Sequence, residues 1–143
     1  MHMEAVFAHA LNCITEFNPK RLVDLHAYFG SYKTAWHAPA RELANVLKDP
    51  EFEHAANKKQ NDTQAEVLQK QLEELHITHL IKEDPLYPEQ LRHIPLPPAL
   101  LYIEGMLLPA DTKPIVAVIG TRMATSYGRE ACEKIIAGLK GYP

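Results

Sequence analysis

A proline-rich segment in the second half of the chain sets the strongest limit on its fold. The sixteen residues 83–98, EDPLYPEQLRHIPLPP, contain five prolines. Proline lacks a backbone N–H group and has a fixed φ angle, so neither a long helix nor a central strand can run through these residues. We expect an ordered, extended connection with one helical turn after Pro88. The sequence before this segment is mostly helical in pattern, and the sequence around and after it is richer in β-branched residues.

The first 75 residues predict a module of short helices. Apolar residues recur at helical spacing from Ala5 to Ile14. Asn18 and Pro19 have the order of a helix cap followed by the first helical residue, and Gly30 is placed to end that helix. Further helices are expected after Ser31, after Pro39 and over residues 62–75. The aromatic residues of this module favour a place in its core over a role in ligand binding: Phe7, Phe17, Phe29 and Trp36.

Residues 76–143 predict the beginning of an α/β domain. The stretches 77–81 (ITHLI) and 99–105 (ALLYIEG) are strand candidates. A third, 115–120 (IVAVIG), is apolar on both faces, as expected of a central parallel strand covered by helices. A helical pattern begins at Ser126. The predicted fold class is therefore α + α/β, with a helical module over residues 1–75 and the incomplete start of a Rossmann-like parallel sheet over residues 76–143.

The turn between the third strand and the last helix is the candidate binding site. In a parallel sheet this turn brings the free N–H groups of a helix N-terminus to the carboxyl edge, where they attract phosphate. Gly120 allows close approach of the backbone, and Arg122 offers a bidentate guanidinium group. The next glycine, Gly128, lies eight positions after Gly120, which fits neither the dinucleotide fingerprint nor a P-loop. Hydroxyl groups come from Thr121, Thr125 and Ser126, with Ser126 as the expected N-cap.

The residues of the turn leave two interpretations open. Either the turn faces a phosphate group, or Arg122 pairs with a nearby carboxylate and the turn only connects two elements. Tyr127 likewise fits a platform on which a base stacks, but a buried ring that fixes the start of the helix is the preferred interpretation.

Composition excludes several classes of protein. A net charge of −3 argues against DNA binding over the whole surface and leaves room for a local site. Cys13 and Cys132 form no CxxC pair, so neither a disulfide scaffold nor a zinc site is expected. His76 and His79 lack a third ligand nearby, and no metal or cofactor is predicted. The chain shows neither a signal peptide nor a membrane span, so we expect a soluble cytoplasmic protein with no membrane partner.

Five blocks, in order along the chain, resemble one known family. AVIGTRMATSYGRE (117–130) is similar to the signature G-[ST]-R-x-x-[ST]-x-Y-G. ITHLIKEDPLYPEQLRHI (77–94) resembles a D-x-x-YP-x-x-L segment, and PLPPALLYIEG (95–105) a PP-x-x-LY-x-x-G segment. YFGSYKTAW (28–36) and RELANVL (41–47) resemble the helical module, described as SAM-like, of the same family. On these blocks the chain is identified as a member of the DNA-processing protein A (DprA/Smf) family.

The resemblance implies a function without catalysis. The family consists of cytoplasmic bacterial proteins that bind single-stranded DNA during natural transformation (competence) and recombination, and that help to load the RecA recombinase onto it. The signature arginine, here Arg122, would contact the phosphate backbone. By the same resemblance, the rim of the DNA pocket is formed by Gly120, Thr121, Ser126 and Gly128. A homodimer would form through regions that this chain does not contain.

Two departures from the family pattern qualify these expectations. The stretch ITEFNPKRLV (14–23) lacks the G-x-G hairpin that often begins the helical module, so a scaffold or interaction role suits that module better. The chain ends before the second glycine-rich loop of the family, so we expect half a pocket and only weak DNA binding. The incomplete sheet would also leave an apolar edge at residues 115–119.

Two other functions stay open. A Rossmann-like enzyme that processes nucleotides, such as a phosphoribohydrolase, would need a catalytic acid near the turn. The nearest carboxylate, Glu130, suits the electrostatics of the helix N-terminus better. The other alternative is a protein-interaction module that acts through residues 1–75.

Overall fold

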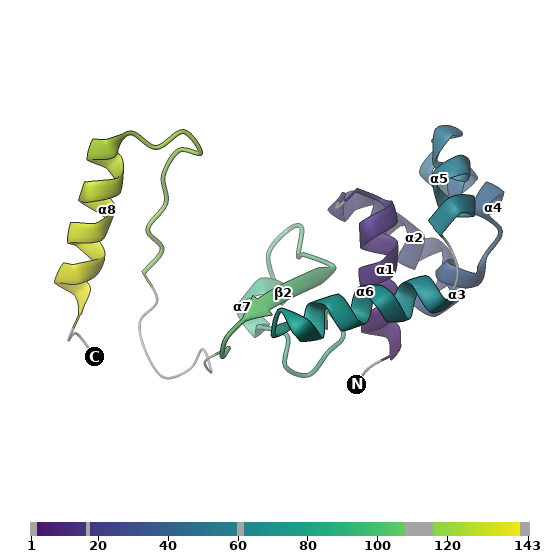
Figure 1. Ribbon diagram of the computed structural model, residues 1–143, viewed down its shortest axis with the longest axis horizontal. Coiled ribbons are helices and arrows are strands. Elements are labelled where there is room, and N and C mark those ends of the chain that lie inside the picture. Colours follow the sequence, from purple (N-terminus) through teal and green to yellow (C-terminus); the bar gives the residue numbers. More distant parts are fainter. Residues whose placement is uncertain (1–2, 17, 60–61, 108–115, 141–143) are drawn as a thin grey trace. The chain divides into compact units, whose positions relative to one another are not determined.

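The computed structural model describes residues 3–16, 18–59, 62–107 and 116–140, which fall into two compact units, Met1–Leu108 and Pro109–Pro143 (Figure 1). The first unit contains six successive helices, then a strand, a short helix and a second strand. These are α1 (Met3–Ile14), α2 (Pro19–Phe29), α3 (Tyr32–His37), α4 (Ala40–Leu47), α5 (Glu51–Lys59), α6 (Asp62–Glu74), β1 (Ile77–Ile81), α7 (Glu89–Arg92) and β2 (Leu100–Glu104). The second unit contains an extended stretch and α8 (Ser126–Leu139).

The ends of the first helices follow the expected capping residues. The Asn18 side chain accepts hydrogen bonds from the backbone N–H groups of Lys20 (3.1 Å) and Arg21 (3.4 Å), and Pro19 is the first residue of α2. Gly30 ends this helix with φ of 75°, a left-handed conformation that only glycine adopts without strain. The Ser31 hydroxyl then caps α3 by accepting from Thr34 N. These boundaries are therefore encoded locally.

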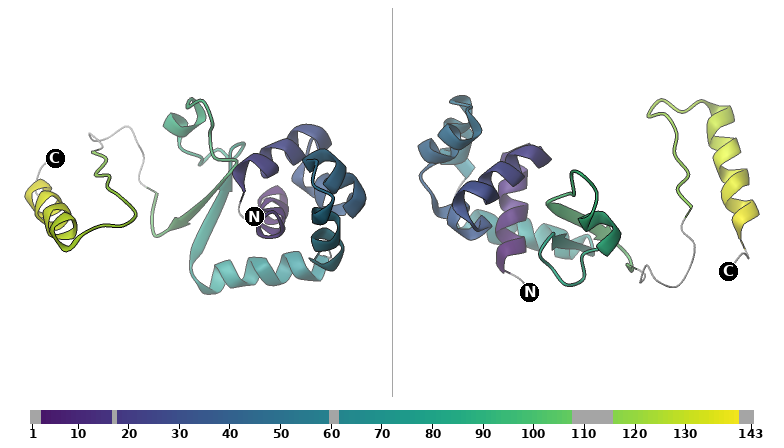
Figure 2. Two further views of the ribbon diagram at one scale, coloured as in Figure 1. Left: turned by 90° about the horizontal axis from the view of Figure 1, so that it is seen from above. Right: turned by 180° about the vertical axis from the view of Figure 1, so that it is seen from behind.

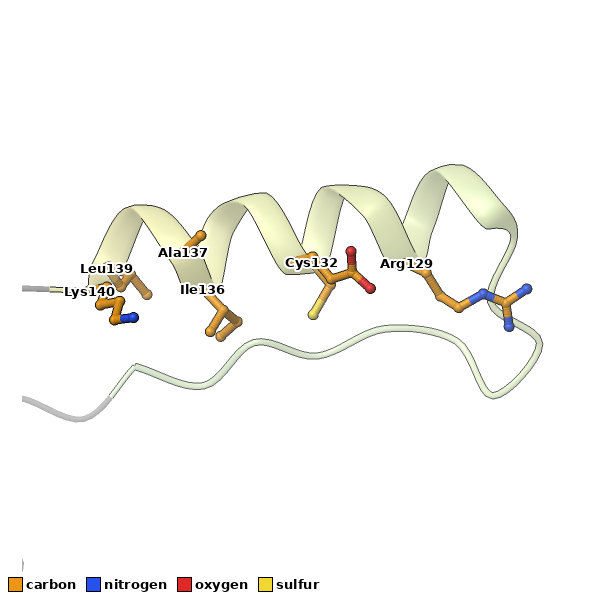
Figure 3. Close-up of a pocket in the computed structure, with 7 residues that line it drawn as sticks. Arg129, Cys132, Ile136, Ala137, Leu139 and Lys140 are labelled. Atoms are coloured by element: carbon orange, nitrogen blue, oxygen red, sulfur yellow. The ribbon is translucent and has the colours of Figure 1, made fainter.

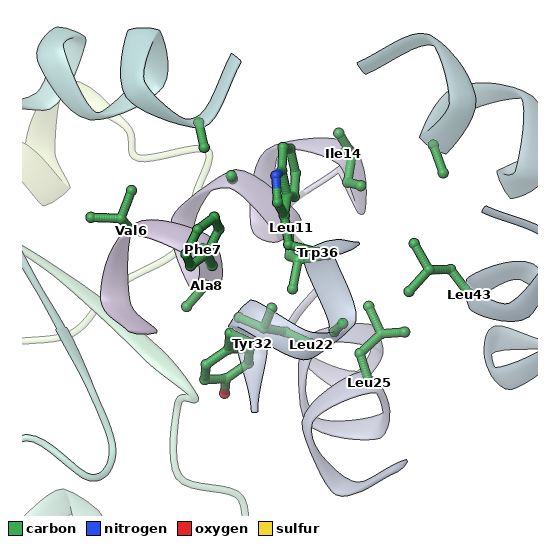
Figure 4. Packing of buried hydrophobic residues seen from close by; sticks show 14 of the residues in the cluster. Val6, Phe7, Ala8, Leu11, Ile14, Leu22, Leu25, Tyr32, Trp36 and Leu43 are labelled. Carbon is green, nitrogen blue, oxygen red and sulfur yellow. The ribbon is translucent and has the colours of Figure 1, made fainter. Parts of the chain in front are cut away.

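The helices of the first unit pack around α1, which Figure 2 shows end-on in its left view. Helix α1 contacts α2, α3, α5, α6 and both strands, so its side chains are buried on nearly every face. Figure 4 shows the resulting core, in which Phe7 and Trp36 lie with ring centroids 6.4 Å apart. Phe29 packs against this core while partly exposed, so these three aromatic residues are core residues as predicted. Phe17 lies outside the described residues.

The two predicted strands near the proline-rich segment are confirmed. β1 and β2 pair antiparallel, from Ile77 opposite Glu104 to Ile81 opposite Leu100. His79, Leu80 and Ile81 are buried against α1 and α6. The described residues thus form an α+β structure, in which the sheet has two strands.

The predicted parallel sheet is not seen in this structure. Residues 116–120 are extended but pair with no described strand. A strand is held by hydrogen bonds to a neighbouring strand, and the described part of the second unit supplies no such neighbour. The domain boundary predicted after residue 75 stays a prediction. It was placed where the sequence pattern changes, whereas the two compact units are separated after Leu108 by their internal contacts. Within the described ranges, no helix is long and apolar enough to cross a membrane.

Candidate functional site

The turn before α8 is organised by two threonine hydroxyls. Thr121 Oγ1 accepts a hydrogen bond from Met123 N at 3.2 Å, and Thr125 Oγ1 accepts one from Gly128 N, also at 3.2 Å. Thr125 has an extended backbone and is the N-cap of α8. The prediction of Ser126 as the cap was wrong by one residue. Ser126 is already helical, whereas the extended Thr125 places its hydroxyl below the N–H group three positions ahead.

The guanidinium group of Arg122 is exposed in this turn and is not neutralised by a described residue. No carboxylate in the described ranges lies within salt-bridge distance of Arg122. Glu130, the nearest acidic residue in sequence, pairs instead with Lys134 at 2.7 Å along the helix. The interpretation in which Arg122 merely pairs with a carboxylate of this unit therefore finds no support in these contacts.

Nothing in the described structure requires glycine, for steric reasons, at the two glycine positions of the turn. Neither Gly120 nor Gly128 adopts a left-handed φ. A Cβ atom added at Gly120 would meet no described atom within 4 Å, and one at Gly128 would lie 3.5 Å from Thr125 Oγ1, an ordinary contact. The backbone conformation alone does not require glycine at either position. A requirement for glycine there would have to come from a molecule that approaches the backbone closely.

Charge and exposure distinguish this unit from the chain as a whole. Residues 116–140 carry four basic and two acidic side chains, whereas the entire chain has a net charge of −3. Tyr127 is 80 % exposed and Met123 is 87 % exposed, so the preferred interpretation of Tyr127 as a buried ring was wrong for this structure. The turn therefore combines an arginine that has no carboxylate partner among the described residues, an exposed aromatic ring and the N-terminus of a 14-residue helix.

One face of α8 borders an open hollow of about 790 Å³, with Cys132 and Ile136 among its lining residues. Figure 3 shows the extended chain before the helix running past these side chains. Arg129 and Lys140 lie near the two ends of this face. The middle of the hollow is lined by Cys132, Glu133, Ile136 and Ala137 and is apolar apart from the Glu133 carboxylate, so it suits the burial of a hydrophobic surface better than the binding of an anion.

The proline-rich segment is held by contacts within itself. The Asp84 carboxylate accepts from Leu86 N at 3.0 Å, and the hydroxyl of buried Tyr87 donates to the Pro98 carbonyl at 2.7 Å. The Arg92 guanidinium donates to the carbonyl oxygens of Lys82 and Asp84 and lies over the Tyr87 ring, 5.3 Å from its centroid. The predicted helical turn after Pro88 is α7. These residues fix the connection between β1 and β2.

The five candidate site residues lie together in the turn before α8 and in the first turn of that helix: Gly120, Thr121, Arg122, Ser126 and Gly128. Their role in binding stays a prediction. Sequence reasoning missed Thr125 as the cap, although the spacing from its hydroxyl to Gly128 N was available in the sequence. Among the described residues, no group of three or more His, Cys, Asp or Glu side chains is placed to hold a metal ion.

Comparison with known proteins relates one part of the chain to a family. Residues 78–142 match the family model described as DNA recombination-mediator protein A. The match covers β1 from its second residue, the proline-rich segment, β2, the turn with Arg122 and all of α8. Helices α1 to α6 lie outside it. No curated protein and no solved structure matches the chain.

Proposed function

Since residues 78–142 match the family model of DNA recombination-mediator protein A, the family that the sequence blocks resemble, we propose that this chain binds single-stranded DNA in recombination. The family points to a role in DNA recombination. The finer statement is our proposal: a cytoplasmic, non-enzymatic protein that binds single strands during natural transformation and assists the loading of RecA. The family match is the observation that carries it.

The geometry of the turn supports DNA as the ligand. Arg122 is exposed and has no carboxylate partner among the described residues, so its charge is available to a phosphate group. The N–H groups at the start of α8 add a favourable electrostatic field for the same group. Gly120 and Gly128 leave the backbone open to approach, and Thr121 and Ser126 supply hydroxyls at the rim. Exposed Tyr127 offers a face for a base next to that phosphate.

In this proposal, residues 115–119 are a central strand of a Rossmann-like parallel sheet and α8 is one of its covering helices. The support is the apolar surface that this unit exposes. Ile119 is 91 % exposed on the extended stretch, and Ile135 and Ile136 are about half exposed on α8. Such a surface is stable in water only when other elements cover it. The hollow beside Cys132 and Ile136 is where a packed sheet would bury this surface.

The absence of catalysis is part of the proposal. Glu130, the nearest acid to the turn, is exposed and paired with Lys134, so it lacks the desolvated setting that tunes a catalytic carboxyl group. Incubation of the 143-residue chain with nucleoside monophosphates, followed by chromatography of the free base, tests this point. We expect no base release above the rate without protein. Release that depends on Glu130 would favour the nucleotide-processing enzyme instead.

The DNA proposal is tested by fluorescence anisotropy of the 143-residue chain with labelled oligonucleotides. We expect weak binding to single strands, with tighter binding to a dT oligonucleotide than to a duplex of equal length. Equal affinity for both forms, or binding to neither at low salt, would contradict the proposal.

A further inference from the structure

A cluster of polar side chains joins α1 to the two-stranded sheet. His9, Asn12 and Cys13 come from α1, His79 from β1 and Tyr102 from β2. His9, Asn12 and His79 are buried, whereas Cys13 is partly buried and Tyr102 is 37 % exposed at the rim of the cluster. The rest of the buried core around α1 is largely apolar. Because a buried polar group must be paired to be tolerated, the pairing within this cluster decides how firmly the sheet is held.

The hydrogen bonds of the cluster suit a neutral His9. Asn12 Nδ2 donates to Tyr102 Oη at 3.0 Å, and Tyr102 Oη lies 2.8 Å from His9 Nδ1. A tyrosine hydroxyl has one proton and two lone pairs, so Tyr102 Oη can accept from Asn12 and donate to the unprotonated Nδ1 of an imidazole that carries its hydrogen on Nε2. If Nδ1 is protonated, the direction of this hydrogen bond reverses, and the cost lies in the charge that is placed in a buried site. The Cys13 thiol lies 3.8 Å from the same ring nitrogen.

The surroundings oppose a positive charge on either histidine. Burial lowers the pKa of His9 to about 4, and the neighbouring His79 adds to this effect. Burial also lowers the pKa of His79, whose ring centroid is 5.8 Å from that of His9. His79 Nε2 is buried and has no hydrogen-bond partner among the described residues. Protonation of one ring would thus place a charge beside a second group that also resists charging.

The other ionisable groups facing the cluster do not neutralise such a charge directly. From α6, Glu73 acts on His79 and raises its pKa, but less than burial lowers it, and the Glu73 carboxylate also accepts from Gln69 Nε2 at 2.9 Å. From β2, burial raises the pKa of Tyr102 to about 12, so this hydroxyl keeps its proton. Backbone hydrogen bonds at Leu68 and Ala5 favour protonated His9 and His79, respectively, and are again the smaller effect.

We propose that these side chains form an acid-sensitive latch between α1 and the sheet. The latch holds β1 and β2 on the helices while both imidazoles are neutral. When His9 takes up a proton on Nδ1, it no longer accepts from the Tyr102 hydroxyl, and a charge is left among α1, β1 and β2. The sheet and the proline-rich connection then separate from α1. The helical core around Trp36 persists, because its buried residues are apolar and most of them belong to α1, α2, α3 and α4.

Hydrogen exchange of the 143-residue chain between pH 7 and pH 4.5 tests the latch. Protection factors, corrected for intrinsic exchange, are measured for β1 and β2, and Trp36 fluorescence reports the helical core in the same samples. For one histidine whose pKa falls from 6.5 to about 4 on folding, we expect the protection of the strands to fall on the order of 50-fold at pH 4.5. We expect Trp36 fluorescence to stay native.

Glutamine variants separate proton uptake from hydrogen bonding. Glutamine can accept and donate as neutral histidine does, but it does not titrate. We expect the double variant His9→Gln, His79→Gln to retain its strand protection at pH 4.5. The control His54→Gln, which changes an exposed histidine on α5, should behave like the unmodified chain. Equal loss of protection in the double variant, or loss of the Trp36 signal together with the strands, would overturn the proposal.

A measurement on the unmodified chain covers the case in which the double variant does not fold at pH 7. The carbon-bound imidazole protons of His9 and His79 are followed by NMR as the pH falls. Titration of both rings below pH 5.5, together with loss of strand protection, supports the latch. Titration of both near pH 6.5, with the strands still protected, overturns it.

Discussion

Replacement of Tyr87 by phenylalanine tests whether the proline-rich segment is fixed by the contacts described above. The substitution removes one oxygen atom, which donates to the Pro98 carbonyl at 2.7 Å. It keeps the ring that lies under the Arg92 guanidinium. A hydrogen bond of this kind contributes about 1 kcal/mol, and a carbonyl left without its donor at a partly buried site adds to the loss. We expect the free energy of unfolding to fall by about 1–2 kcal/mol.

Urea unfolding followed by the fluorescence of Trp36 measures this loss. Trp36 is the single tryptophan of the chain and is 1 % exposed. At pH 7, where both imidazoles are neutral and the sheet is held on the helices, it reports on the segment because Ile81 and Ala99, at the two ends of the connection, belong to the same buried cluster. For a slope of about 2 kcal/mol/M, the urea midpoint should move down by about 0.5–1 M. The control is Tyr28→Phe, which changes a tyrosine that is 63 % exposed. Equal midpoints for the two variants would refute the reasoning.

Three further predictions concern the first unit. Leu11→Ala removes a fully buried side chain from the centre of α1 and should lower the free energy of unfolding by about 2–5 kcal/mol in urea, whereas Val23→Ala, at an exposed position, should cost less than about 1 kcal/mol. Gly30→Ala places a Cβ atom at a φ of 75° and should destabilise by about 1 kcal/mol in thermal unfolding, although no described atom lies within 4 Å of that Cβ. The pKa of His9 is about 4 in the folded chain and 6.5 in the unfolded chain, so at pH values between 4 and 6.5 the unfolded chain binds more protons than the folded chain. Stability should be complete above pH 6.5 and fall by up to about 3 kcal/mol as the pH approaches 4, as measured by urea unfolding at several pH values.

Local signals in the sequence were sufficient for much of the first unit. Asn18, Gly30 and Ser31 end or begin helices through contacts with residues two to four positions away, which a sequence pattern can show. Helix α5 was not predicted, because its sequence has little helical periodicity: among the side chains described for residues 51–58, only Phe52 and Ala56 are buried. Its start depends on the Asp49 carboxylate, which accepts from Glu51 N at 3.2 Å.

Contacts between residues far apart in the chain could not be predicted from the sequence. Tyr102 meets His9 and Asn12 across about ninety residues, and nothing near His9 in the sequence indicates that partner. The candidate site was predictable only as a type of turn. Arg122 and the two glycines follow a recognisable pattern, but the ligand that would explain them depends on the family and not on the local geometry.

The salt dependence of DNA binding after the change Arg122→Ala tests the central claim most directly. Anisotropy titrations of the 143-residue chain with dT and mixed-sequence oligonucleotides are repeated at several salt concentrations, with Arg41→Ala as the control at an exposed arginine of α4. If Arg122 contacts a phosphate, its loss should weaken binding to both oligonucleotides alike and reduce the slope of log K against log salt by about 0.7. The Arg41→Ala variant should keep the original slope. An Arg122→Ala variant with unchanged affinity and unchanged slope would contradict the account.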